Sequence, residues 1–199
     1  MASIRLSSAA LALAIAGSLI QANAHGQTAA SASTATASKQ TVSLLGGKLR
    51  FALPPGFTAN AVQPGDLEDK SANVDGRAYA NHASQQMILA AEHSPMPDGI
   101  RVADDDAKFL DGVMASVVGQ QQAWQDYQRL GEKSISIKGL GLRQLDTTAS
   151  FSGKPMQVTM LLAGSGNALA LIRISSNADD VSNHKNLVAS VLDGIRVGR

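Results

Sequence analysis

The sequence has no cysteine among its 199 residues. This absence excludes disulfide bonds, thiolate metal sites, a cysteine nucleophile and a lipid-modified cysteine. Long apolar runs are also missing. The most apolar stretch, residues 6–20, is interrupted by serine and glycine and is shorter than the roughly 20 residues that span a bilayer. We therefore expect no membrane anchor.

The sequence also lacks an excess of charge of either sign. Seventeen lysines and arginines face sixteen aspartates and glutamates, which gives a formal net charge of +1. Nucleic acids and anionic membrane surfaces attract proteins through a strongly basic surface. Neither is expected as a partner of this chain.

The first 24 residues have the features of an export signal. Arg5 provides a positive start, residues 6–20 are apolar and alanine-rich, and Ala22 and Ala24 are the small residues that a signal peptidase recognises. We predict a signal peptide over residues 1–24, cleaved after Ala24. The mature protein is then expected in the periplasm or outside the cell.

The remaining chain divides into a linker and one domain. Residues 25–40 have small and polar side chains with nothing large to bury, which is typical of a flexible linker. Residues 41–199 have the length of a single domain. We see no internal repeat and no second linker.

The first half of the domain contains two strand pairs and a helix. Residues 41–57 predict a short hairpin around Gly46 and Gly47, and residues 77–93 predict a second strand pair. Residues 58–76 are polar and predict a loop. The spacing of apolar residues then changes to that of a helix, expected over residues 104–122.

The second half predicts four strands and a closing helix. Short glycine-containing connections separate the strand segments, so neighbouring strands are expected to pair antiparallel. Asn177 or Asp179 is expected to cap the helix, whose buried face would contain Val181, His184, Val188, Val191 and Ile195. This order of elements predicts an α+β fold, in which helices flank a central antiparallel sheet as an α/β/α sandwich.

Ser165 lies between two glycines in the stretch LLAGSGNALALI, residues 161–172. A nucleophile elbow would require G-x-S-x-G between a strand and a helix, and a phosphate loop would require a helix start. Another strand is expected to follow instead. The favoured interpretation is a hairpin turn, in which Asn167 and the glycines adopt positive φ values.

Two sets of polar residues could bind metals but favour structural roles. The spacing of Asp104, Asp105 and Asp106 does not match a calcium loop, and their position favours the start of a helix. Among the histidines, His82 and His93 lie near strand ends, and His184 lies on an apolar helix face. We therefore expect no catalytic residue, no cofactor-binding residue and no metal site.

Two further features have weaker functional interpretations. His25 would become the mature N-terminus after cleavage, where its amine and imidazole could chelate copper(II), although a flexible linker cannot position a third ligand. Trp124 and Tyr127 could line a binding surface, but packing at the end of the preceding helix is favoured.

The sequence resembles the DcrB family of bacterial envelope proteins, within the wider PsbP-like fold. Residues 42–57 look like the first hairpin of that family, and residues 133–180 look like its later strands, including the turn at 164–167. The resemblance covers most of residues 41–195. It implies a central antiparallel sheet flanked by helices and a non-enzymatic role in the cell envelope. The family's lipid-attachment cysteine is missing here.

These observations predict a soluble, exported, non-enzymatic protein that binds another, unidentified envelope protein. One alternative is a small-ligand binder with a pocket between the sheet and a helix. A hydrolase that uses Ser165, or a histidine with Asp104 to Asp106, is the less favoured alternative, because no catalytic constellation is visible.

Overall fold

The computed structural model describes residues 40–60 and 74–198. Within these ranges the chain forms ten strands, two α-helices and two short 3-10 helices. In chain order they are β1 (Thr41–Leu44), η1 (Leu45–Gly47), β2 (Leu49–Ala52), β3 (Thr58–Asn60), β4 (Val74–Asn81), β5 (Gln86–His93), η2 (Pro97–Gly99), α1 (Ala107–Gln121), β6 (Gln125–Ile137), β7 (Leu140–Phe151), β8 (Lys154–Ser165), β9 (Ala168–Asn177), α2 (Val181–Gly194) and β10 (Arg196–Val197).

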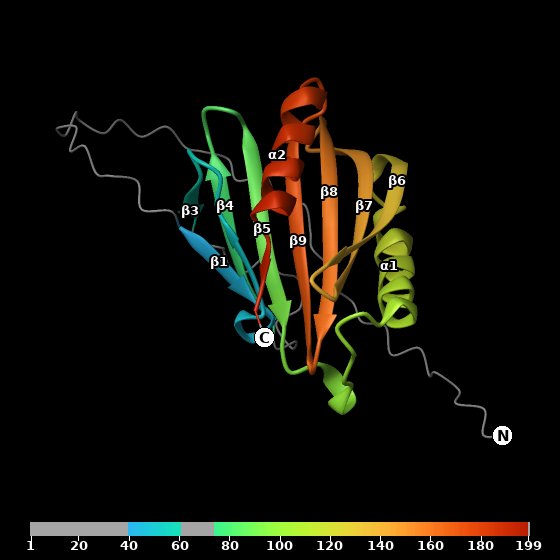
Figure 1. The fold of residues 1–199 in the computed structure, drawn as a ribbon. Helices are drawn as coiled ribbons and strands as arrows, with labels where there is room; N and C mark the ends of the chain where they lie inside the picture. The colour runs from blue at the N-terminus through green and yellow to red at the C-terminus, as the bar shows by residue number, and fades with distance from the viewer. Residues whose placement is uncertain (1–39, 61–73, 199) are drawn as a thin grey trace.

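Seven strands form the main sheet, in the order β3-β4-β5-β9-β8-β7-β6 (Figure 1). After β5 the chain passes through α1 to the far edge of the sheet. It then returns through three hairpins, so that β9 pairs antiparallel with β5. Every pairing in the sheet is antiparallel, as the short connections predicted.

The two faces of the main sheet are covered differently. Helix α1 packs on one face over β7 and β8. The opposite face is covered by α2 and by a second sheet of three strands, in the order β1-β2-β10. A separate cluster of buried aliphatic side chains fills each interface. The predicted α+β sandwich is confirmed, and so is the hairpin expected over residues 41–57, which forms β1 and β2. The sequence did not indicate that this hairpin forms a separate sheet with β10.

The central strand β9 shows why both layers are needed. Leu169 and Leu171 belong to the cluster under α1, whereas Ala170 and Ile172 belong to the opposite cluster. A strand that is apolar on both sides is stable only when both sides are covered. The nearly continuous apolar segment of residues 168–172 therefore encodes its position in the middle of the sheet.

Aspartate side chains cap both helices. Asp106 accepts a hydrogen bond from the backbone N–H of Phe109, and Asp180 accepts one from that of Asn183. The expected cap at Asn177 or Asp179 is therefore wrong, because the cap is Asp180, one residue after Asp179 and three after Asn177. Val181 is also 46% exposed, since it lies at the first turn, beyond the buried face. Neither described helix has the length and hydropathy required to cross a bilayer.

Two strands differ from the expected boundaries. Strand β6 begins at Gln125, well before the expected start at Lys133, because its polar first half gives no apolar alternation. The expected loop of residues 58–76 is wrong at both ends, where β3 and the first residues of β4 form strands. Residues 61–73 lie outside the described residues, as do the expected signal peptide and nearly all of the linker.

Candidate functional site

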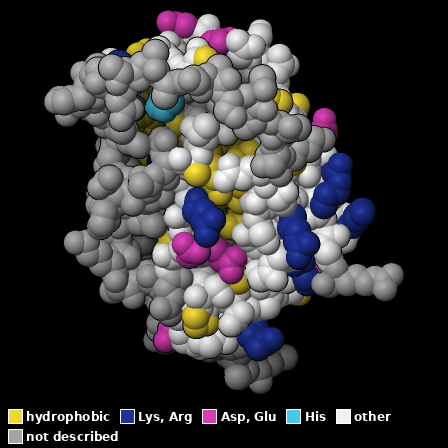
Figure 2. Space-filling model, turned by 90° about the vertical axis from the view of Figure 1, so that its left-hand side faces the viewer, with side chains coloured by type: hydrophobic (Ala, Val, Ile, Leu, Met, Phe, Trp, Pro, Cys, Tyr) yellow, Lys and Arg dark blue, Asp and Glu magenta, His cyan; other side chains and the backbone are white. Residues whose placement is uncertain are grey.

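A cleft of about 470 Å³ opens where the small sheet meets β4 and β5 of the main sheet. Figure 2 views the molecule from this side and shows basic and acidic side chains next to a strip of hydrophobic surface. The lining residues come from β1, η1, β4 and the end of β5. This cleft is the candidate functional site.

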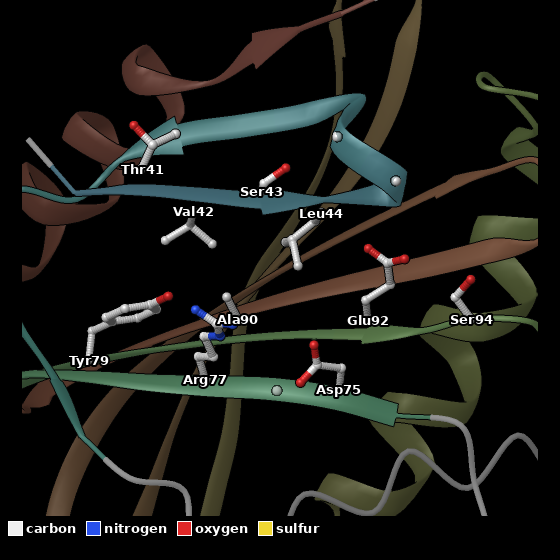
Figure 3. Close-up of a pocket in the computed structure, with 13 residues that line it drawn as sticks. Thr41, Val42, Ser43, Leu44, Asp75, Arg77, Tyr79, Ala90, Glu92 and Ser94 are labelled. Atoms are coloured by element: carbon white, nitrogen blue, oxygen red, sulfur yellow. The ribbon is translucent and has the colours of Figure 1, made fainter.

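The cleft exists because β1 is an edge strand that faces the main sheet without joining it. Val42 and Leu44 point from β1 toward β4 and β5, as Figure 3 shows. At one end the Glu92 carboxylate accepts a hydrogen bond from the backbone N–H of Leu45. This contact fixes η1 to β5 and sets the separation of the two walls.

Strand β4 supplies the charged side chains. Asp75, Arg77 and Tyr79 alternate along the strand and point into the cleft (Figure 3). Burial raises the pKa of Tyr79, and the positive charge of Arg77 and its hydrogen bond to the phenol partly offset this effect. Tyr79 is therefore a neutral hydroxyl at physiological pH, next to an exposed guanidinium.

Two carboxylates face one another at the end of the cleft next to η1. Asp75 is the direct cross-strand neighbour of Glu92. Like charges directly opposite in a sheet destabilise it, so the arrangement favours binding of a positive or hydrogen-bond-donating group. Arg77, two residues along β4, could pair with an anionic group of the same ligand.

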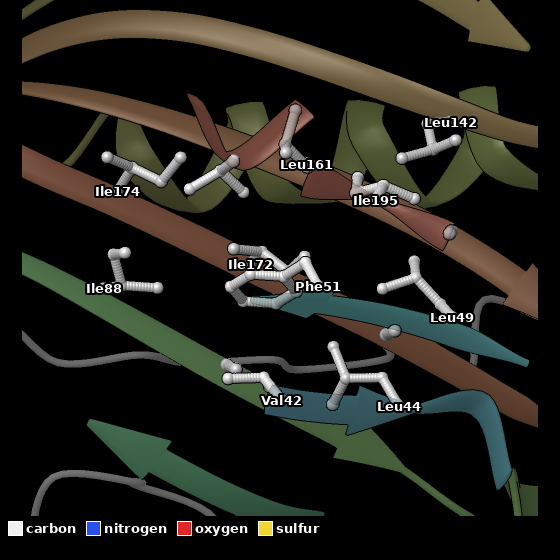
Figure 4. Close-up of a cluster of buried hydrophobic side chains, with 14 of the residues drawn as sticks. Val42, Leu44, Leu49, Phe51, Ile88, Leu142, Leu161, Ile172, Ile174 and Ile195 are labelled. Carbon is white, nitrogen blue, oxygen red and sulfur yellow. The ribbon is translucent and has the colours of Figure 1, made fainter. Parts of the chain in front are cut away.

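The apolar wall of the cleft is continuous with the protein core. Val42 and Leu44 belong to the larger buried cluster, where they lie beside Phe51 and Leu49 of β2 (Figure 4). An incoming apolar group would contact a wall already held rigid by this packing. The cleft can therefore hold a small molecule, or a side chain of a partner, that combines an apolar part with a charged part.

The sequence contains a local signal for the cleft residues Asp75, Arg77 and Tyr79. Residues 75, 77 and 79 alternate with small residues, a period that places all three on one face of a strand. The part played by Glu92 depends on η1, which lies 47 positions away in the chain. No local pattern predicts that contact.

Ser165 forms part of a tight turn, as expected. It is the last residue of β8, and Gly166 adopts a φ of +60°. Gly166 also exchanges backbone hydrogen bonds with Val102, at 2.7 and 3.0 Å. The expected positive φ at Asn167 is wrong, because Gly166 is the only residue of the turn with that conformation.

The side chain of Ser165 donates a 2.6 Å hydrogen bond to Asp104. Lys48 also contacts this carboxylate, at 2.8 Å. The hydrogen bond from Lys48 lowers the pKa of Asp104 most, and the hydrogen bond from Ser165 lowers it further. An ionised carboxylate that is already paired with a lysine is a poor general base. The arrangement fastens η1, the β8–β9 turn and the segment before α1 together.

The three consecutive aspartates therefore have different roles. Asp106 caps α1, Asp104 forms the ion pair with Lys48, and Asp105 is exposed. Among the described residues, no three histidine or carboxylate side chains lie close enough to hold a metal ion together.

His184 lies at the centre of a buried polar network. It is 5% exposed, and its ring nitrogens contact Ser176 at 2.6 Å and Thr159 at 3.0 Å. Thr159 in turn donates to Asp146 at 2.6 Å. Burial lowers the pKa of His184, and the charge of Asp146 acts in the opposite direction to a smaller extent. The expected satisfied histidine is confirmed, although its partners were not predicted.

The order serine, histidine, threonine and aspartate has the elements of a proton relay. Ser176 is only 1% exposed, however, and the network lies beneath α2, where a substrate has no access. A nucleophile requires a space in which the reacting atom of the substrate can sit beside it. The network therefore fastens α2 to the main sheet.

The other histidines and Trp124 are not part of the cleft lining. His82 is exposed after β4, His93 is buried at the end of β5, and His25 lies outside the described residues. The ring of Trp124 packs edge to face on Phe151, with centroids 5.0 Å apart. The packing role expected for Trp124 is confirmed.

No protein-family model matches the sequence. The chain is 27% identical over 173 residues to the inner membrane lipoprotein DcrB of Shigella flexneri, a match that covers 86% of this chain and 84% of the relative. This chain is a distant homologue of DcrB. The family resemblance seen in the sequence is thereby confirmed. The name of DcrB describes that relative as a lipoprotein of the inner membrane.

The structure is also similar to solved structures of other proteins. The structure of cyanobacterial PsbP from Synechocystis sp. PCC 6803 matches with a TM-score of 0.58 and 15% identity, over 87% of this chain and all of that protein. LpqN of Mycobacterium tuberculosis matches with a TM-score of 0.49 and 13% identity, over 81% of this chain and 86% of that one. The first match shows that the DcrB homologue has a PsbP-like fold.

Proposed function

We propose that this chain is an exported, non-enzymatic accessory protein of the cell envelope that acts by binding another envelope protein. The observation that carries the proposal is the homology to DcrB, which extends over most of both chains. DcrB is named a lipoprotein, whereas this sequence has no cysteine to carry a lipid. The proposed location is therefore the soluble phase of the periplasm.

The arrangement of the polar side chains supports binding over catalysis. Ser165 hydrogen-bonds an aspartate that is already paired with Lys48, and the serine next to His184 is buried beneath a helix. Neither serine has an oriented base together with an open site for a substrate. The hydrolase alternative loses support from both arrangements.

The location can be tested by expressing the full chain with a C-terminal tag in a Gram-negative host. We expect the tagged protein in the osmotic-shock fraction, with His25 as its first residue by mass spectrometry. A variant with Ala22→Glu and Ala24→Glu should stay unprocessed, because a signal peptidase requires small residues at these positions. A cytoplasmic, full-length product of the unmodified gene would contradict export.

Partner binding can be tested by chemical cross-linking in intact envelopes, followed by capture of the tagged chain. We expect one or a few proteins at levels well above those captured by an unrelated exported domain with the same tag. Identical capture profiles for the two proteins would contradict the proposal.

Binding of a small molecule in the cleft is a second candidate, favoured by the facing carboxylates of Asp75 and Glu92. Native mass spectrometry of the protein purified from the periplasm should then show a reproducible added mass. Arg77→Ala should reduce this adduct, whereas Arg101→Ala, at an exposed position outside the cleft lining, should not. An adduct of equal abundance in both variants would place the ligand elsewhere.

A further inference from the structure

Strand β6 forms one edge of the main sheet. It is 13 residues long and pairs with β7 alone among the described strands. Its register is irregular between Gln125 and Gly131 and regular from Gly131 to Ile137. Irregular pairing protects an edge against further strands, whereas a regular edge presents a row of free backbone groups. The second half of β6 is therefore an open edge.

One face of this open edge carries two isoleucines and a lysine. Lys133, Ile135 and Ile137 lie opposite Gln144, Leu142 and Leu140 on β7. Leu140 and Leu142 are fully buried in the larger core cluster. Ile135 and Ile137 pack against the same cluster but are only partly buried.

A groove of about 560 Å³ runs beside this face. It lies between the end of β6 and the point where α2 leads into β10. Its apolar lining comes from Ile135, Ile137, Leu192 and Ile195, and its charged lining from Lys138, Asp193 and Arg196. An open strand edge beside an apolar groove is the geometry that β-strand addition uses.

We propose that residues 131–137 of β6 bind an extended segment of a partner protein as an additional strand of the main sheet. The segment would carry apolar side chains opposite Ile135 and Ile137 and an acidic side chain opposite Lys133. The backbone hydrogen bonds would supply attachment, and the alternate side chains would supply selectivity. This inference deepens the proposed function, since it identifies the surface that contacts a protein partner.

The charges around the groove specify an acidic segment. Lys133 is exposed on the apolar face, and Lys138 and Arg196 lie at the groove, opposed there by Asp193 alone. Glu132 on the other face is already paired with Arg129. Opposite charges that face one another across two strands stabilise their pairing, and like charges oppose it.

A second copy of this chain is the alternative occupant. Two β6 strands that pair antiparallel around Lys133 or around Glu132 would place like charges directly opposite one another, which opposes these two registers. Pairing around Ile135 would instead place Lys133 opposite Ile137. A dimer is therefore an outcome that the test must separate from partner binding.

The test uses a synthetic peptide with capped ends and the order Thr-Val-Thr-Val-Thr-Glu-Thr. In antiparallel register its alternate side chains face Ile137, Ile135 and Lys133. We expect NMR amide shifts to concentrate in β6, with an affinity about tenfold higher than that of the same peptide with lysine in place of glutamate. A version with N-methyl groups on the edge facing β6 should not bind, because it cannot form the backbone ladder.

Variants of the full chain separate charge from folding. Lys133→Glu, at an exposed position, should reverse the preference so that the lysine peptide binds more tightly. Ile135→Glu should abolish binding, and Val181→Glu, an exposed aliphatic position on α2, should leave it unchanged. Unfolding temperatures of all three variants identify any loss that is due to destabilisation.

Three outcomes would overturn the inference. These are equal affinity for the glutamate, lysine and N-methylated peptides, amide shifts that avoid β6, and a concentration-dependent dimer in sedimentation that Ile135→Glu abolishes. Capture of an envelope protein that is unaffected by Lys133→Glu and Ile135→Glu would leave the proposed function standing and reject this surface. Peptide binding to β6 without capture of any envelope protein would support this surface and contradict the proposed function.

Discussion

His184 on α2 and Ser176 on β9 are joined by a 2.6 Å contact through Nδ1 of the imidazole. The other ring nitrogen contacts Thr159, whose hydroxyl already donates to Asp146. Thr159 must then accept from Nε2–H, which leaves Nδ1 without a proton and able to accept from Ser176. The network therefore selects one neutral tautomer of His184.

This tautomer predicts that the protein loses stability in mild acid. The folded state lowers the pKa of His184, so the unfolded chain binds the proton more readily. The contribution is complete above the unfolded pKa, about 6.5, and is lost as the pH falls toward the lower folded value. The slope from this one group is at most about 1.4 kcal/mol per pH unit within that interval.

Urea denaturation between pH 5 and pH 8 checks this prediction. His184→Gln removes the titrating ring, so the pH dependence in this range should flatten. His82→Gln, at an exposed position, should keep the slope of the unmodified protein. The prediction fails if His184→Gln and the unmodified protein have parallel curves.

The ion pair between Lys48 and Asp104 predicts a small, salt-dependent contribution to stability. Both side chains are partly exposed, at 26% and 42%, and such pairs contribute at most about 1 kcal/mol. Asp104→Asn should reduce the free energy of unfolding by that order. Because the folded pKa of Asp104 is lowered, the loss should be present at neutral pH and should disappear as the pH falls through that pKa.

The control for this ion pair is Asp105→Asn, at the exposed neighbouring position. Denaturation at low and at high salt should show a smaller difference between Asp104→Asn and the control at high salt. Equal stability of the two variants at low salt would show that the pair contributes nothing measurable.

Gly164, in the stretch that contains the Ser165 turn, is sterically constrained. A Cβ atom at this position would lie 2.9 Å from Cγ2 of Val102. Gly164→Ala should therefore destabilise the protein by about 1–3 kcal/mol through overpacking. The matched substitution Gly112→Ala in α1 meets open space and should stabilise the protein by up to about 1 kcal/mol. Denaturation curves of both variants give the comparison, and a neutral Gly164→Ala would contradict it.

Trp124 is the only tryptophan in the chain and reports on the junction of α1 and β6. Removing its ring contact by Phe151→Leu should shift its fluorescence emission to the red and cost roughly 0.5–1.5 kcal/mol of stability. Phe57→Leu, in the core of the opposite face, should leave the emission of the folded protein unchanged. An unchanged emission in Phe151→Leu would show that the ring contact does not shield the indole.

The sequence predicted the elements whose pattern repeats locally. The apolar run of residues 168–172 gave the position of β9, and the glycines around Ser165 gave a turn. The hairpin of β1 and β2 was predicted, but its third strand, β10, was missed because it has only two residues and no pattern of its own. The first half of β6 was missed for a similar reason, since an exposed edge strand requires no apolar alternation.

The cleft could be predicted only in part. The alternation of Asp75, Arg77 and Tyr79 was readable, but its significance depends on β1 lying across from it. The contact between Leu45 and Glu92 joins segments that share no local signal. Sites made where two layers meet depend on tertiary placement, which a single sequence does not reveal.

The pairing of β5 with β9 has a consequence for the proposed export of the chain. Met87 pairs with Ser175 and His93 with Leu169, so this central strand pair forms only after β9 has been made. Pairings between distant residues make folding slow. If the chain is exported as proposed, an emerging N-terminal half would lack the partner of β5 and is expected to stay unfolded, which is the state that a narrow translocation channel accepts.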